Sequence, residues 1–238
     1  MGRNSINSEV RSAFFAALPH TLPIFAGFWF LGLTYGIYMN AAGFSFWYPL
    51  GMSLVIFAGS MEFVTVGLLL GTFHPIQAFV MALVMGARHI FYGLSMLERY
   101  SGTGWKKGYL IFGMCDESFS INYTAEIPLG IDRGWFFFFV TLLNHFYWVF
   151  GASMGGLLGQ VISLNTEGIS FVMTAMFVVI FVEQWEKEKD HTSALIGLLL
   201  PLGCLVLFGA DRFLLPAMGA ILLILTLLRR RLSRRETV

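Results

Sequence analysis

Three charged clusters lie inside apolar stretches of this sequence, and their side chains are the ones able to do chemistry there. The clusters are Glu62, the pair Arg88-His89 and the pair Asp116-Glu117. A charged side chain at the centre of a bilayer costs about 2.5–3.5 kcal/mol on insertion scales, so it is retained where it pairs, faces water or acts on a ligand. Function is therefore expected at these positions.

The first cluster combines small residues with a carboxylate. Gly59 and Ser60, just before Glu62, weaken a helix and allow a ligand or a neighbouring backbone to approach closely. A helix broken at this point presents backbone dipoles at the middle of the bilayer, as in many transporter sites. We expect Gly59, Ser60 and Glu62 to line a binding cavity. The alternative is a helix that packs through Gly59, with Glu62 held in a structural hydrogen bond.

The second cluster joins a permanent cation to a titratable imidazole. The planar guanidinium of Arg88 is suited to carboxylates, either those of the protein or that of an amino-acid substrate. We assign Arg88 and His89 to substrate binding. A structural ion pair of Arg88 with Asp116 or Glu62 fits the sequence equally well.

The third cluster, Asp116-Glu117, places two carboxyl groups side by side in an apolar segment. Two adjacent carboxyl groups in a low dielectric rarely both stay ionised. A carboxyl that exchanges its proton near neutral pH is what a proton-coupled carrier needs. We therefore assign both residues to proton coupling, the alternative being solvated acids at an aqueous surface. Asn144-His145 is a weaker candidate, because a histidine in an aromatic helix is usually packed and hydrogen-bonded.

The composition indicates that these clusters are held by membrane helices. Of the 238 residues, 57% are hydrophobic and only 12% are charged, whereas a soluble domain has roughly 25% charged residues. The length suits one integral membrane domain, residues 1–238, with about seven or eight hydrophobic segments of roughly 20 residues each. We predict an all-α polytopic membrane protein. Its apolar stretches run over residues 13–39, 49–72, 76–97, 108–126, 135–159, 168–185, 192–208 and 212–229.

Prolines and glycines occur at spacings of four residues in the longest apolar stretches. Pro19 and Pro23 lie four residues apart in the first stretch, where each frees a backbone carbonyl and bends the chain, so we assign both to a helix break. Two small-xxx-small series predict close helix contacts. They are Gly32 and Gly36 in the first stretch, and Gly151, Gly155 and Gly159 in the fifth.

A weak internal sequence repeat favours two related halves, residues 13–126 and 135–229. Val55-Ile56-Phe57 and Val179-Ile180-Phe181 are each followed a few residues later by a glutamate. Transporters are often built from such repeats. If the second and sixth stretches enter the bilayer and return, rather than cross it, the halves become inverted repeats. Both this re-entrant topology and one with eight crossings stay open.

Arginines indicate the orientation of the chain. Arg229, Arg230 and Arg231 begin a basic C-terminus, and Arg3 and Arg11 flank the first apolar stretch. By the positive-inside rule we expect both termini to be cytoplasmic. The sequence contains no Gly-rich phosphate loop, HExxH motif, nucleophile elbow or spaced Cys/His set, so we predict neither an enzyme nor a cofactor or metal.

Taken in order, these motifs resemble the AzlC family of branched-chain amino acid exporter subunits. The matching residues are Leu18-Pro19 and Pro23, Phe57-Ala58-Gly59-Ser60, Ala87-Arg88-His89 with Tyr92-Gly93, and Asp116-Glu117-Ser118-Phe119, with looser matches at Trp148, Gly151 and Gly155. The family commonly has Gln where Glu62 stands and often Asn where Ala87 stands.

The resemblance implies the large subunit of a two-component exporter in the bacterial cytoplasmic membrane. Its usual partner is a small membrane protein of the AzlD family. We therefore expect export of small apolar amino acids, with Arg88 binding the substrate carboxylate or acting as its counter-ion, and with coupling to protons. A passive amino-acid channel, an accessory scaffold and, less favoured, an intramembrane enzyme are the alternatives.

Overall fold

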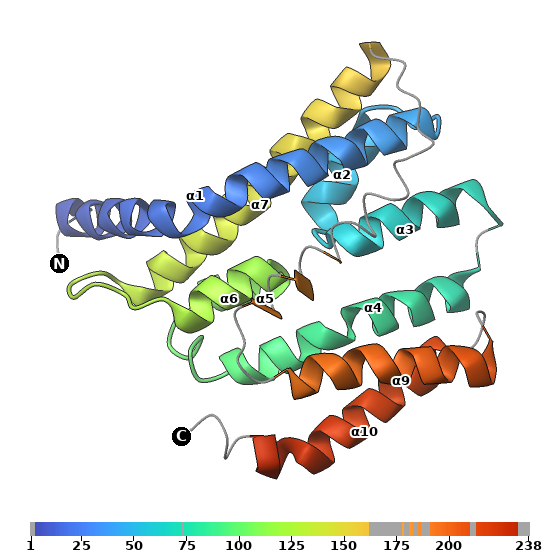
Figure 1. Cartoon of the computed structure of the whole chain (residues 1–238). Coiled ribbons are helices and arrows are strands. Elements are labelled where there is room, and N and C mark those ends of the chain that lie inside the picture. Colours follow the sequence, from blue (N-terminus) through green and yellow to red (C-terminus); the bar gives the residue numbers. More distant parts are fainter. Residues whose placement is uncertain are drawn as a thin grey trace. The chain divides into compact units, whose positions relative to one another are not determined.

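The computed structural model describes residues 3–72, 74–161, 178, 181–182, 185–186, 191–209 and 213–232. The regular elements of this part of the chain are all α-helices, so the predicted all-α fold class is confirmed for it. The helices, shown in Figure 1, are α1 (Arg3–Ala41), α2 (Trp47–Val55), α3 (Gly59–Leu70), α4 (Pro75–Met96), α5 (Lys106–Phe112), α6 (Asp116–Thr124), α7 (Arg133–Val161), α9 (Thr192–Phe208) and α10 (Leu214–Leu232).

The chain divides into two compact units, Met1–Met173 and Thr174–Val238. The first unit contains α1 to α7, and the second contains α9 and α10, which contact each other. The predicted sixth stretch, residues 168–185, lies almost entirely outside the described residues, as do residues 179 and 180 of the weak internal sequence repeat. The repeat and the number of crossings therefore remain predictions.

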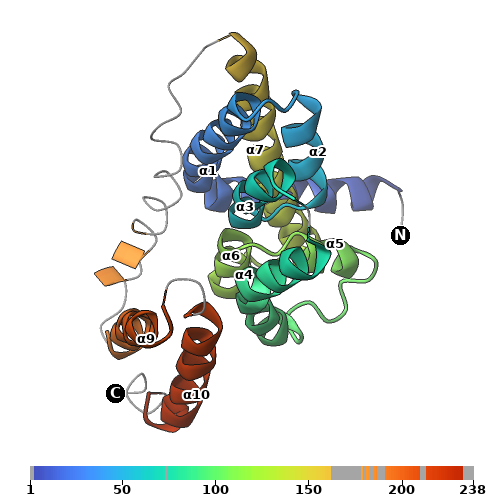
Figure 2. The same cartoon turned by 90° about the vertical axis from the view of Figure 1, so that its right-hand side faces the viewer.

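Two of the described helices are long and apolar enough to cross a bilayer. They are the segment Ser8–Ala41 of α1 and the whole of α7. These two helices make the most extensive helix contact of the first unit, and Figures 1 and 2 both show them side by side. The first unit is thus organised around a pair of helices of membrane-spanning length.

Glycines bring the backbones of α1 and α7 together. A Cβ atom on Gly32 would lie 2.9 Å from the backbone nitrogen of Ala152 and 2.9 Å from the carbonyl oxygen of Trp148. A Cβ atom on Gly151 would lie 2.6 Å from the carbonyl oxygen of Trp29. No larger side chain fits at such distances, so the predicted packing role of both glycine series is confirmed.

The predicted helix break at Pro19 and Pro23 is wrong, because α1 continues through both residues. Figure 1 shows a change of direction in the first half of α1 instead. Each proline removes one hydrogen bond of the helix, which bends it, but the neighbouring turns continue the helix and tertiary contacts support it. One such contact is between the hydroxyl groups of Thr21 and Tyr147, which lie 3.3 Å apart.

The second and fourth apolar stretches are each divided into two short helices. Residues 56–58 separate α2, of 9 residues, from α3, of 12 residues. Residues 113–115 separate α5, of 7 residues, from α6, of 9 residues. At 1.5 Å per residue, α2 and α3 are about 14 and 18 Å long, so neither alone crosses a hydrocarbon core of roughly 30 Å. The break considered beside Gly59 is present, whereas the one before Asp116 was not predicted.

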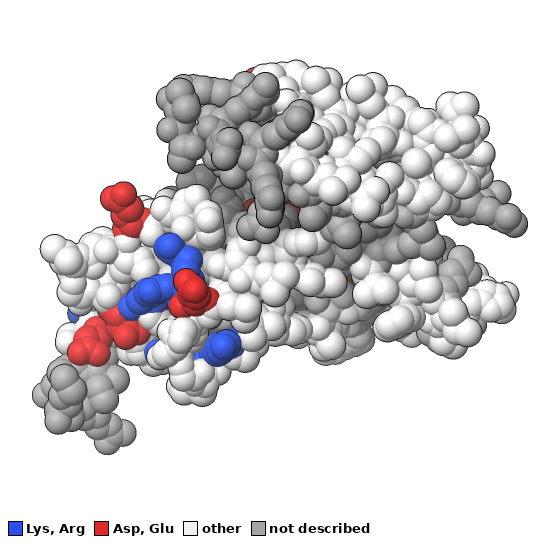
Figure 3. All heavy atoms as spheres, turned by 90° about the horizontal axis from the view of Figure 1, so that it is seen from below, with Lys and Arg blue, Asp and Glu red and all other residues white. Residues whose placement is uncertain are grey.

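The surface of the described residues suits contact with lipid. On the face seen in Figure 3, the charged side chains gather in one area and a large uncharged surface lies beside it. Among the exposed large apolar side chains are Phe79, Leu83 and Ile90 of α4. Soluble monomers rarely expose contiguous apolar patches of this kind, whereas lipid-facing helices do.

Candidate functional site

Glu62 lies in the first turn of α3 and is completely buried. Its Oε1 atom accepts hydrogen bonds from the backbone N–H of Ala58 at 3.1 Å and from the indole N–H of Trp148 at 2.9 Å. Its Oε2 atom has no hydrogen-bond partner among the described residues. The carboxylate stabilises the N-terminus of α3, where the helix dipole favours negative charge. One oxygen therefore has the structural role, and the other is left for a further group.

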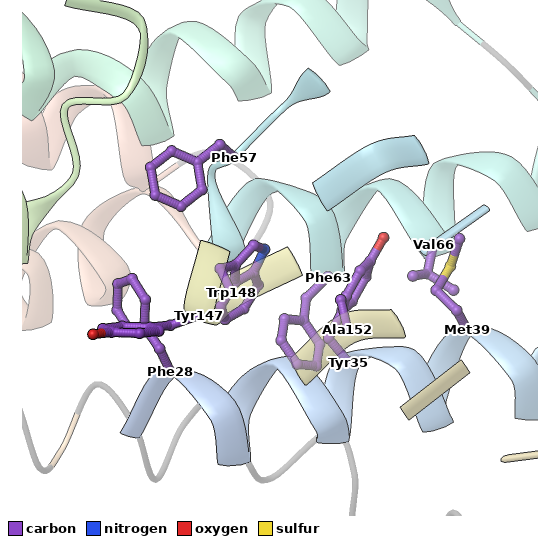
Figure 4. Packing of buried hydrophobic residues seen from close by; sticks show 9 residues of the cluster. All are labelled: Phe28, Tyr35, Met39, Phe57, Phe63, Val66, Tyr147, Trp148 and Ala152. Carbon is purple, nitrogen blue, oxygen red and sulfur yellow. The ribbon is translucent and has the colours of Figure 1, made fainter. Parts of the chain in front are cut away.

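Phe57 and Gly59 shape the first break. The φ angle of Phe57 is 46°, a left-handed conformation that residues other than glycine rarely adopt, and its ring centroid lies 4.3 Å from that of His145. A Cβ atom on Gly59 would lie 2.9 Å from Cη2 of Trp148, so the indole lies directly on this glycine. Figure 4 shows Phe57 and Trp148 in the same apolar cluster. Ser60 is half-buried and makes no side-chain hydrogen bond among the described residues.

Asp116 and Glu117 begin α6 at the second break. Oδ2 of Asp116 lies 3.2 Å from Nη1 of Arg88 on α4. Of the two partners that the sequence analysis considered for Arg88, the structure thus pairs it with Asp116. No ion pair joins Arg88 to Glu62 within the described residues. Nε of Arg88 and Oδ1 of Asp116 are buried and have no hydrogen-bond partner in that part of the chain. Each member of the pair thus keeps a polar atom for another ligand.

The remaining predicted site residues surround this pair. Glu117 is half-buried, and its carboxylate lies beside the sulfur of Cys115. The Ser118 hydroxyl accepts the backbone N–H of Cys115 at 2.9 Å and so closes the start of α6. Nδ1 of His89 lies 3.3 Å from the carbonyl oxygen of Gly86, and its ring packs edge-on against Tyr92. The partial burial of Glu117 does not fit the alternative of freely solvated acids.

Helix α7 contributes polar residues to the site, of which the sequence analysis named only Asn144, as a weaker candidate. Thr141, Asn144 and Trp148 follow one another at spacings of three and four residues, so they share one face of the helix. All three side chains are buried. Oγ1 of Thr141 and both amide atoms of Asn144 have no hydrogen-bond partner among the described residues. The signal available in the sequence was this helical spacing of polar groups within an aromatic segment.

His145 links both interrupted helices to α7. Its Nδ1 lies 3.0 Å from the hydroxyl of Tyr109 on α5, and its Nε2 lies 3.2 Å from the carbonyl oxygen of Ser53 on α2. The expectation that this histidine is packed and hydrogen-bonded is confirmed. The helices α2 and α5 end directly before the two breaks. His145 contacts the last turn of each, so both breaks lie beside α7.

The fold and the site define an all-helical membrane protein with a buried glutamate at one helix break and two partly buried acids at another. The family model described as AzlC protein matches residues 23–162. The branched-chain amino acid transport protein AzlC of Bacillus subtilis is 60% identical over 229 residues, which is 96% of this chain and 90% of that protein. The chain belongs to the AzlC family.

Other relatives are also named as membrane proteins. An uncharacterized membrane protein of Haemophilus influenzae is 48% identical over 236 residues, covering 99% of this chain and 96% of that protein. The inner membrane protein YgaZ of Escherichia coli is 24% identical over 199 residues, covering 79% of this chain and 80% of that protein. No solved structure matches the chain. The family that the motifs indicated is confirmed, and a membrane location is supported.

Proposed function

We propose that this chain is the large subunit of an exporter of small apolar, branched-chain-like amino acids. The observation that carries the proposal is the ion pair of Arg88 and Asp116 at the second helix break, with an unpartnered polar atom on each side chain. A free amino acid is a zwitterion, whose carboxylate fits a guanidinium and whose ammonium fits a carboxylate. The name of the Bacillus subtilis relative supports the choice of branched-chain substrates.

The pair allows exchange of partners without leaving an isolated charge. Without substrate, Arg88 and Asp116 neutralise each other at 3.2 Å. A bound zwitterion takes over both contacts, its carboxylate at Arg88 and its ammonium at Asp116. The two side chains are partly exposed, at 40% for Arg88 and 27% for Asp116, so a ligand can reach both charges. The site therefore selects ligands that carry both charges.

Proton coupling follows from the two acids at the start of α6. When Glu117 takes up a proton, the negative charge near Arg88 falls and the guanidinium is freer to bind the substrate carboxylate, while the ionised Asp116 binds the substrate ammonium. When Asp116 takes up a proton, its contact with the ammonium is lost and the substrate is released. Gly59, Ser60, Glu62 and His89 complete the lining in this proposal. The unpartnered Oε2 of Glu62 is the polar atom offered from the first break.

The test is amino-acid efflux from proteoliposomes under an imposed pH gradient. Arg88→Ala and Asp116→Asn should each lower leucine and valine efflux at least tenfold at equal protein levels. Lys106→Ala is the matched control, because Lys106, the first residue of α5, pairs with Asp132 at 3.7 Å and has no role in the proposal. Normal efflux in both site variants refutes the assignment. Efflux that ignores the pH gradient identifies a passive channel instead.

The partner, the membrane and the topology belong to the same proposal. We expect a small AzlD-like membrane subunit to co-purify with the chain from the bacterial cytoplasmic membrane. Cysteine labelling at the two ends of the chain should find both on the cytoplasmic side. Labelling of Lys106→Cys from outside supports eight crossings, whereas labelling from inside supports re-entrant second and sixth stretches.

A further inference from the structure

We propose that Asn144 and Thr141 of α7 form a second, uncharged part of the substrate site and bind the head group of the amino acid between the two helix breaks. This inference rests on the proposed transport of amino acids. It adds two residues on α7 to a site that is otherwise formed by the interrupted helices and α4.

The contacts of α7 locate these side chains. Thr141 contacts Gly113 in the second break, where a Cβ atom would overlap the threonine methyl group. About two turns further along the same face, Trp148 contacts Gly59 at the first break. Asn144 lies between Thr141 and Trp148 on that face, so it lies between the two breaks.

The breaks themselves meet beside this face. The ring of Phe57, in the first break, is 3.9 Å from the position of a Cβ atom on Gly113, in the second. Cys115, also in the second break, packs against the cluster that contains Phe57 and Trp148. The interrupted segments and the polar face of α7 therefore enclose one common region.

Three buried polar atoms of α7 in this region have no partner among the described residues. Asn144 is completely buried, and neither its amide nitrogen nor its amide oxygen has a hydrogen-bond partner among the described residues. Oγ1 of Thr141 is equally buried and without a partner in that part of the chain. A buried polar group without a partner is destabilising, so its retention points to a ligand. A side-chain amide offers N–H donors and a carbonyl acceptor, so it matches a ligand that has both kinds of group, as the head group of an amino acid does.

The interrupted helices add suitable backbone groups. The start of α3 carries the positive end of a helix dipole and is occupied by the carboxylate of Glu62, whereas the end of α2 carries the negative end, which favours an ammonium. Half-helix ends of this kind hold substrates and ions in other transporters. His145, the residue after Asn144, lies 3.2 Å from the carbonyl oxygen of Ser53 in the last turn of α2, so α7 contacts this helix end.

The test measures leucine binding to the full chain purified in detergent, together with its melting temperature without ligand. Asn144→Leu keeps a similar volume but removes both polar atoms, and Thr141→Val removes only the hydroxyl. We expect each variant to fold, with a melting temperature at or above that of the wild type, and to bind leucine at least tenfold more weakly. If Asn144→Leu does not fold, Thr141→Val decides by the same criterion.

The controls are buried residues whose polar groups have partners inside the protein. The Thr21 hydroxyl lies 3.3 Å from that of Tyr147, and the buried Thr103 hydroxyl donates to the carbonyl oxygen of Tyr100 at 2.9 Å. Thr21→Val and Thr103→Val should lower the melting temperature and leave the affinity of the folded protein for leucine within about twofold of the wild type.

Three outcomes decide the matter. A loss of leucine affinity without a loss of stability supports the proposal. Unchanged affinity in Asn144→Leu and Thr141→Val overturns it, and leaves the proposed transport function standing if the wild type binds leucine. A wild type that binds neither leucine, valine nor isoleucine overturns the proposed function, and this inference with it.

Discussion

The glycine contact between α1 and α7 leads to a graded prediction for alanine substitutions along one helix. Gly27 has no other atom within 4 Å of the position of a Cβ, whereas a Cβ on Gly32 would lie 2.9 Å from two backbone atoms of α7. At Gly36 the overlap with the backbone of α7 is more severe still. The same substitution in the same helix should therefore have opposite effects on stability at Gly27 and at Gly36.

The magnitudes follow from these distances. Nonbonded heavy atoms prefer separations of about 3.5–4.0 Å, so Gly32→Ala forces α1 and α7 apart by roughly 0.6–1.1 Å. Overpacking of this kind costs about 1–3 kcal/mol, and Gly36→Ala should reach or exceed the upper end. Gly27→Ala gains up to about 1 kcal/mol, because alanine favours the helix more than glycine does.

The assay is thermal unfolding of the purified protein, followed by loss of the monodisperse peak in size-exclusion chromatography. For a chain of this size, each kcal/mol corresponds to a shift of about 2–4 °C in Tm. We expect the order Gly27→Ala, wild type, Gly32→Ala, Gly36→Ala from most to least stable. If Gly36→Ala is as stable as Gly27→Ala, the two backbones do not touch, and the argument for this crossing is wrong.

Three further substitutions test single contacts by the same thermal assay. Trp148→Phe removes the indole donor of Glu62 while keeping an aromatic ring, and should cost about 1.5–3 kcal/mol; an unchanged Tm argues against this hydrogen bond. Asn144→Leu removes an unpartnered buried amide, and should raise stability without substrate by about 1–3 kcal/mol; a fall means that the amide has a structural partner. Asn122→Leu breaks the bond to Tyr100, and should cost about 1–3 kcal/mol; a stable variant contradicts that role.

The candidate site was only partly predictable from the sequence. The buried acids and the cation were found because charge is rare in apolar stretches, and the packing glycines were found from their spacing. The break before Asp116 was missed because hydropathy averages over a window, and a few residues of irregular backbone hardly change the average. The bend at Pro19 and Pro23 was taken for a break because sequence alone does not reveal the tertiary contacts that support a helix.

Asn144 and Thr141 carried too little signal to be assigned. Neither is charged, so within an apolar stretch they stand out less than the acids and the arginine do. Their interest arises from complete burial without hydrogen-bond partners, which is a property of packing. A sequence gives the polar groups of a helix and their spacing, but not which of them find partners on neighbouring helices.

By itself, the sequence determined the class of this protein, its family resemblance and the positions of its charges. These depend on composition and on motifs along the chain, so they can be derived without the tertiary structure. The tertiary structure alone decided that Arg88 pairs with Asp116, and that Glu62 is held by Trp148 instead. Such pairings depend on where helices cross, and the crossing of α1 and α7 is set by backbone contact between glycines far apart in the chain.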